Sequence, residues 1–281
     1  LGPSRGLSDR RAVAGGRATL AYWHGAQATS PSMALLLAGV RLDLLAMALR
    51  GAKVPNLDDV VAPLDAELAQ AMATPGLALP VARLRVDEAI DRAEHDMERG
   101  NKAAAEERLR AAIAKWSEDP IGKSMPGDLS VLRNRYGEML RDRGEFDAAR
   151  EQFEAVRRLL GDGESGPVRD PEVMHVRGYA LWELGRIAYQ HEEWEESLPF
   201  LVAAAEEYER HVVAFPDDPR QRISLACVLT ELAQVERQRG VDEVAVVARL
   251  ERARRFFFSD VDQITRDRRS REAACTDLQL L

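Results

Sequence analysis

The sequence contains few lysines, cysteines and aromatic residues, and these shortages exclude some classes of protein. Only four of its 39 basic residues are lysines. A GC-rich genome explains this bias, and so does recognition of acidic partners, because guanidinium groups bind carboxylates bidentately. Cys227 and Cys275 provide neither a disulfide framework nor a metal-binding spacing. We therefore expect a reducing compartment, namely the cytoplasm.

Long hydrophobic runs and an excess of positive charge are also missing. The longest apolar run, from Met33 to Val40, is followed by Arg41. It is too short to cross a bilayer, so no membrane span is expected. The net charge of −8 at pH 7 does not favour nucleic acid as a partner.

The sequence lacks the residue patterns that mark catalytic and metal sites. None of the five histidines lies within helical reach of another, and no His-Glu-x-x-His pattern occurs. Neither a phosphate-binding loop nor a nucleophile elbow is present. We therefore expect no enzyme activity, no cofactor and no metal site.

The residues that are abundant favour helices that pair into repeated hairpins. Ala, Leu, Arg and Glu dominate a composition that is 46% apolar and 31% charged, and these side chains favour helix. A pattern of small and large apolar residues recurs near residues 100, 144, 192 and 240. One copy contains Tyr136, Gly137, Leu140, Gly144, Phe146, Ala149, Phe153 and Val156, and another contains Leu181, Leu184, Gly185, Tyr189, Trp194, Ser197, Leu198, Leu201 and Ala204.

These residues resemble the tetratricopeptide repeat, whose hairpins stack into a superhelical solenoid. The resemblance covers about residues 77–257 and implies an all-α fold. Successive copies are spaced by 44, 48 and 48 residues, whereas the standard repeat has about 34. Long helices of the kind found in bacterial signalling proteins would account for this longer spacing.

The pattern divides the chain into four parts. We expect a flexible Gly- and Arg-rich arm at 1–32, a helical cap at 33–76, repeats at 77–258 and a C-terminal capping helix at 259–281. Because the arm is rich in arginine and poor in acids, it also fits part of a transit peptide, which would place the protein inside an organelle. The predicted hairpins pair 77–99 with 103–117, 129–143 with 145–160, 172–191 with 193–214, and 219–239 with 241–257.

In proteins of this family, the first helix of each hairpin lines a concave groove that binds a partner. The resemblance places ten residues there: Asn134, Glu138, Arg141, Trp182, Arg186, Tyr189, Gln190, Gln234, Arg237 and Gln238. The arginine row (Arg141, Arg186, Arg237) would suit a peptide that carries acidic groups and an apolar anchor. Alternatively, these arginines are solvated or pair with nearby acids. With no lysine on the groove, a clamp for chaperone tails is not expected.

A second basic patch is expected near the C-terminus. It comprises Arg252, Arg254, Arg255, Arg268, Arg269 and Arg271, whereas residues 192–209 contain seven glutamates and no arginine or lysine. This asymmetry would dock one copy on another, guide a polyanion, or simply form solvated helix faces.

The sequence thus predicts a non-catalytic scaffold or adaptor that binds a protein or peptide. Three alternatives remain: a structural subunit of a large assembly, a regulatory or sensor segment of a larger signalling protein, and an RNA-contacting helical repeat. The identity of the partner and the oligomeric state are left open.

Overall fold

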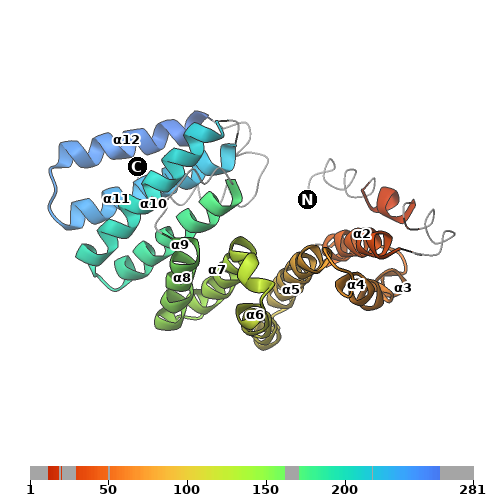
Figure 1. Cartoon of the computed structure of the whole chain (residues 1–281). Helices are drawn as coiled ribbons and strands as arrows, with labels where there is room; N and C mark the ends of the chain where they lie inside the picture. The colour runs from red at the N-terminus through yellow and green to blue at the C-terminus, as the bar shows by residue number, and fades with distance from the viewer. Residues whose placement is uncertain are drawn as a thin grey trace. The chain divides into compact units, whose positions relative to one another are not determined.

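The protein is an all-α helical-repeat structure. The computed structural model describes residues 12–18, 20, 30–49, 51–161, 171–216 and 218–259, and this part contains no strand. Figure 1 labels its helices in chain order. They are α2 (Pro31–Leu49), α3 (Leu57–Val61), α4 (Leu64–Met72), α5 (Ala78–Glu98), α6 (Lys102–Glu118), the 3-10 turn η1 (Gly122–Ser124), α7 (Pro126–Asp142), α8 (Phe146–Leu160), α9 (Pro171–Gln190), α10 (Trp194–Ala214), α11 (Pro219–Gln238) and α12 (Glu243–Ser259).

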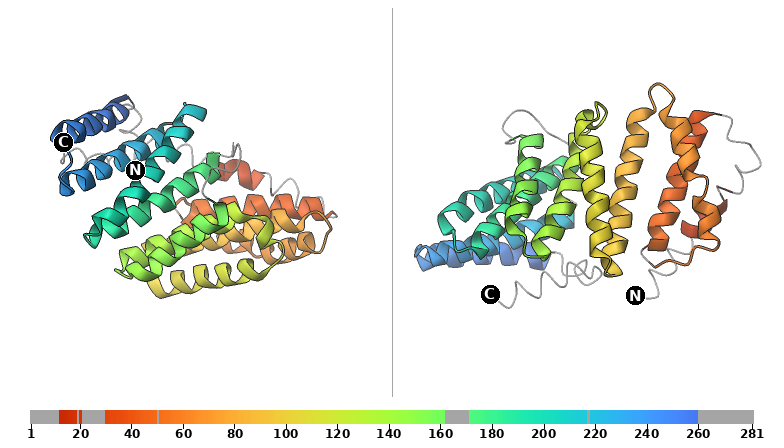
Figure 2. Two further views of the ribbon diagram at one scale, coloured as in Figure 1. Left: turned by 60° about the vertical axis from the view of Figure 1, so that its left-hand side comes forward. Right: turned by 90° about the horizontal axis from the view of Figure 1, so that it is seen from below.

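The helices divide into two compact units at residue 132, a boundary that falls within α7. In the first unit, α2 packs against α3, α4 and α5, while α5 packs against α6. In the second unit, α8 packs on α9, α9 on α10, α10 on α11 and α11 on α12. The views of Figure 2 show this serial order for α9 to α12. The division does not coincide with the predicted boundary at residue 77, because Val81 of α5 shares a core with α2 and α4.

The four predicted hairpins are present as α5–α6, α7–α8, α9–α10 and α11–α12. Their turns share one backbone hydrogen-bonding pattern. At the α7–α8 turn, Gly144 N–H donates to the Arg141 carbonyl at 2.8 Å and Glu145 N–H donates to the Leu140 carbonyl at 2.9 Å. This pair of bonds satisfies carbonyl groups at the end of the first helix and needs one residue with positive φ. Gly100, Gly144 and Gly240 supply it at φ 80°, 80° and 72°.

Glu192 takes the glycine position at the α9–α10 turn, with φ 61°. A non-glycine residue in the left-handed conformation costs about 1–2 kcal/mol of strain. Glycine removes this strain, but it also raises the entropy of the unfolded chain, which offsets part of the gain in stability. We expect Glu192→Gly to raise the free energy of unfolding by about 1 kcal/mol, measured by urea denaturation. Glu193→Gly is the matched control, because Glu193 has φ −85°; that variant should be neutral or destabilised. A lower midpoint for Glu192→Gly would contradict the expectation.

Small residues stand where the two helices of a hairpin approach closely. A β-carbon at Gly137 would lie 2.7 Å from the Phe153 ring, and one at Gly185 would lie 2.7 Å from Leu201. Both distances are shorter than real contacts, so any side chain there would require Phe153 or Leu201 to shift from its packed position. The repeated small–large pattern of the sequence therefore reflects packing inside each hairpin.

Helix α2 is longer than the uninterrupted apolar run of the sequence. It has 19 residues, an 18-residue window of it has a mean hydropathy of 1.8, and it is long and apolar enough to cross a membrane by length and composition. The apolar character continues on both sides of Arg41, which interrupts the run. In the structure Arg41 is buried and its Nε donates to Glu67 of α4 at 2.8 Å. Core helices pass the same test, and α2 packs within the first unit.

The predicted terminal segments lie largely outside the described residues. Within the predicted arm, residues 12–18 are helical. Val13 and Leu20 are buried with Leu37 and Leu44 of α2, so this part of the arm contributes to a core. The predicted capping helix at 259–281 lies outside the described residues except for Ser259, the last residue of α12.

Candidate partner-binding face

The ten predicted groove residues belong to α7, α9 and α11, the first helices of the last three hairpins. Within the second unit these helices are linked directly: α9 packs on α11, and the Asn134 side chain of α7 donates to the Val176 carbonyl of α9 at 2.9 Å. We call the surface formed by these three helices the α7–α9–α11 face.

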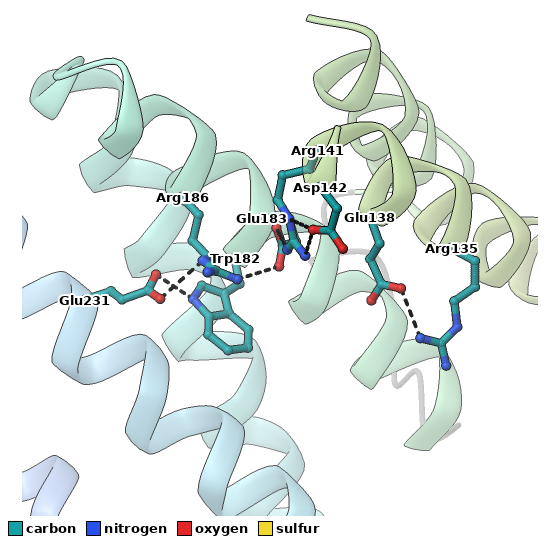
Figure 3. A network of polar contacts seen from close by, with 8 residues as sticks. All are labelled: Arg135, Glu138, Arg141, Asp142, Trp182, Glu183, Arg186 and Glu231. Carbon is teal, nitrogen blue, oxygen red and sulfur yellow. Dashed lines mark hydrogen bonds and ion pairs between the residues drawn. The ribbon is translucent and has the colours of Figure 1, made fainter. Parts of the chain in front are cut away.

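A buried carboxylate, Glu183, lies at the centre of this face (Figure 3). Its side chain is 0% exposed and accepts hydrogen bonds from two guanidinium groups. Arg141 of α7 donates from Nη1, and Arg186 of α9 donates from Nη1 at 3.0 Å. Because an unpaired buried carboxylate is costly, the two arginines are required structurally.

Arg186 extends the network from α9 to α11. Its Nε lies 3.3 Å from Glu231 Oε1, and its guanidinium carbon lies 5.5 Å from the centre of the Trp182 ring. The Trp182 indole N–H donates to the Glu231 carboxylate at 2.7 Å. Burial alone would lower the pKa of Arg186, but Glu231 and Glu183 outweigh it and raise that pKa. The arginine therefore stays charged and joins two hairpins.

The three arginines of the row are neither equivalent nor all unpaired. Counting from the close-packed small residues Gly137, Gly185 and Ala233, Arg141 and Arg237 each come four residues later, but Arg186 comes one residue later. The described pairs match the alternative that the arginines pair with nearby acids. Arg141 also donates from Nη2 to Asp142 at 2.7 Å, and Glu138 accepts from Arg135 at 3.0 Å.

Sequence reasoning missed Glu183 and Glu231, which hold this network together. Glu183 lies between Trp182 and Leu184 in a segment dominated by apolar residues. A charged residue inside such a segment, three positions before an arginine, is the signal that would have identified it.

A pocket of about 220 Å³ opens where α9 and α11 end. It is lined by Tyr189, Gln234, Arg237, Gln238 and Leu250. Four of these were predicted from the sequence, and only Leu250 of α12, the second helix of its hairpin, was not. Gln190 is exposed and does not line the pocket. The Tyr189 ring is held edge-on against Trp194, with ring centres 5.0 Å apart.

The predicted basic patch is partly used within the chain. Arg252 pairs with Glu209 of α10 at 2.8 Å. Arg252, Arg254 and Arg255 are all exposed. Arg268, Arg269 and Arg271 lie outside the described residues. Glutamates at the start of α10 form ion pairs with arginines of both neighbouring hairpins. Arg150 binds Glu193 and Glu196, and Arg239 binds Glu195. Part of the charge asymmetry thus fastens one hairpin to the next.

Across the described ranges, no group of three or more His, Cys, Asp or Glu residues could hold a metal ion. Cys227 is buried in the core shared by α10, α11 and α12.

Comparison with known proteins gives information on the fold. No family model matches the chain, and no curated protein matches it. A similar solved structure is BtubC (BKLC) from P. vanneervenii, with a TM-score of 0.59 and 18% sequence identity over 90% of both chains. At this identity the similarity concerns the fold alone.

Proposed function

We propose that the protein is a tetratricopeptide-like scaffold that binds a protein or peptide partner on the α7–α9–α11 face. The pocket carries this proposal, because it gathers an aromatic ring, two amides, a guanidinium group and an aliphatic side chain from three helices. A recess that combines apolar walls with a few polar groups is typical of a site that takes an anchoring side chain. Rigidly stacked hairpins present such a site at little entropic cost.

The partner would reach the face through the groups that the structure leaves accessible. Gln238 and Arg237 are exposed, and Gln234 is half-buried one helical turn before Gln238. Amides at this spacing lie on one side of a helix and can bond successive peptide groups. Arg141 and Arg186, by contrast, would act by fixing the helices that form the face.

A direct test compares two double variants as bait for partners from the source lysate. Gln234→Ala with Gln238→Ala removes both amides, and we expect it to weaken capture of the wild-type partner about tenfold. Arg254→Ala with Arg255→Ala changes exposed arginines elsewhere and should retain the partner. Circular dichroism would verify that both variants fold.

The opposite result would overturn the proposal. Loss of the partner only in the arginine variant would move the interface to α12. If that binding also weakened steeply as salt rose, it would favour the RNA-contacting alternative.

A further inference from the structure

Arg237 differs from the other arginines of the row in the carboxylate that it binds. Arg141 and Arg186 bind Glu183, whose side chain is 0% exposed. Arg237 binds Glu243, with Nη2 2.9 Å from Oε1, and the two side chains are 46% and 63% exposed. Exposed pairs of this kind contribute little net stability. Of the three, this ion pair is the easiest to open.

Neither charge would be stranded if the pair opened. Glu243 is the first residue of α12, where the free amides and dipole of a helix N-terminus stabilise a carboxylate. Arg237 is in the last turn of α11, where the helix dipole favours a cation. Solvent reaches both groups, so another carboxylate can replace Glu243 on Arg237 without burying a charge.

The pocket beside Arg237 suits an apolar side chain. Tyr189 and Leu250 provide apolar walls, and the volume is about 220 Å³. A dry cavity of about 150 Å³ is known to hold a benzene ring. A side chain as large as phenylalanine therefore fits in size, with its neighbour in the peptide next to Arg237.

We propose that Glu243 occupies the position that an acidic side chain of the partner takes on Arg237. The partner would be a peptide segment in which an aspartate or glutamate adjoins a large apolar residue. The apolar side chain enters the pocket, and the carboxylate displaces Glu243. This inference rests on the proposed function, since it names the ligand of the same pocket.

The experiment uses two capped dipeptides as probes, N-acetyl-Phe-Asp-amide and N-acetyl-Phe-Asn-amide, which differ only in the carboxylate. Binding to the full chain would be followed by NMR of the Tyr189 ring, with affinities of about millimolar expected for such small ligands. The wild type should bind the Asp probe more tightly than the Asn probe. Glu243→Gln should tighten binding of the Asp probe about two- to fivefold.

Two further variants separate the outcomes. Arg237→Gln should abolish the preference for Asp, because it removes the group that distinguishes the two probes. Glu195→Gln is the matched control: it opens another exposed pair, with Arg239, but Glu195 does not line the pocket. It should leave both affinities unchanged.

Equal binding of the two probes would overturn the inference and leave the pocket as the proposed site. Equal tightening in Glu195→Gln and Glu243→Gln would also overturn it, because the effect would then come from overall charge. If neither probe binds, the pocket accepts no anchor, and the proposed function fails with the inference.

Discussion

Replacing Glu183 with alanine should lower the free energy of unfolding by about 3 kcal/mol, the cost of removing one partner of a buried ion pair. The carboxylate is fully buried and is shared by Arg141 and Arg186. Without it, Arg141, whose side chain is 17% exposed, would lose its interhelical partner. Urea denaturation followed by circular dichroism measures the change. Glu243→Ala is the matched control, and we expect it to lower the same free energy by less than about 1 kcal/mol.

A double variant shows whether the loss comes from the unpaired charge. In Glu183→Leu with Arg141→Leu, both charges are replaced by apolar groups, and we expect most of the stability to return. A double variant as unstable as Glu183→Ala would mean that the carboxylate acts through packing. In that case the electrostatic account of the α7–α9–α11 face would be wrong.

Lowering the pH from 7.5 to 5 should destabilise the second unit through one buried histidine and one half-buried histidine. His211 of α10 is 1% exposed, and neither ring nitrogen has a hydrogen-bond partner. Burial lowers the pKa of His211, although Asp218 and Glu207 oppose the shift. Burial likewise lowers the pKa of His175, although its hydrogen bond with Gln221 opposes this.

The sign of the effect follows from proton binding. The unfolded chain, with a histidine pKa of about 6.5, binds more protons than the folded chain once the pH falls toward that value. Stability is therefore present above pH 6.5 and is lost below it, at a slope of at most about 1.4 kcal/mol per pH unit for each histidine. Thermal unfolding at a series of pH values tests this.

His211→Phe should flatten the pH dependence, because it removes the imidazole that takes up the proton. A phenyl ring suits the position, since the His211 ring packs edge-on against Phe215 with ring centres 5.1 Å apart. His191→Phe is the control, since His191 is exposed at the α9–α10 turn. An unchanged profile in His211→Phe, or the same flattening in His191→Phe, would contradict the assignment.

The hairpins could be predicted because their signals are local. A glycine with positive φ at Gly144 and a small residue facing a large one, as with Gly137 and Phe153, lie within one hairpin. Each can be recognised without knowing how hairpins stack. The helix bounds agree with the prediction to within three residues for the same reason.

The pairing on the face could not be predicted, because it depends on the register between hairpins. Arg141 and Glu183 are separated by 42 residues, and the repeat pattern fixes neither the rotation of α9 nor the reach of the arginine. Arg141 and Arg237 hold equivalent positions in the repeat, yet one is built into a network and the other lines a pocket. Sequence reasoning named four of the five pocket residues but did not show which arginines bind a buried carboxylate.

The Glu183 network also affects how cooperatively the second unit should unfold. In a linear array, each hairpin has its own folding free energy and gains the rest from the interface with its neighbour. The bonds from Arg141 to Glu183 and from Arg186 to Glu231 lie at two successive interfaces. They therefore favour concerted melting of α7 to α12, and their removal would allow the terminal hairpin α11–α12 to fray while the others stay folded.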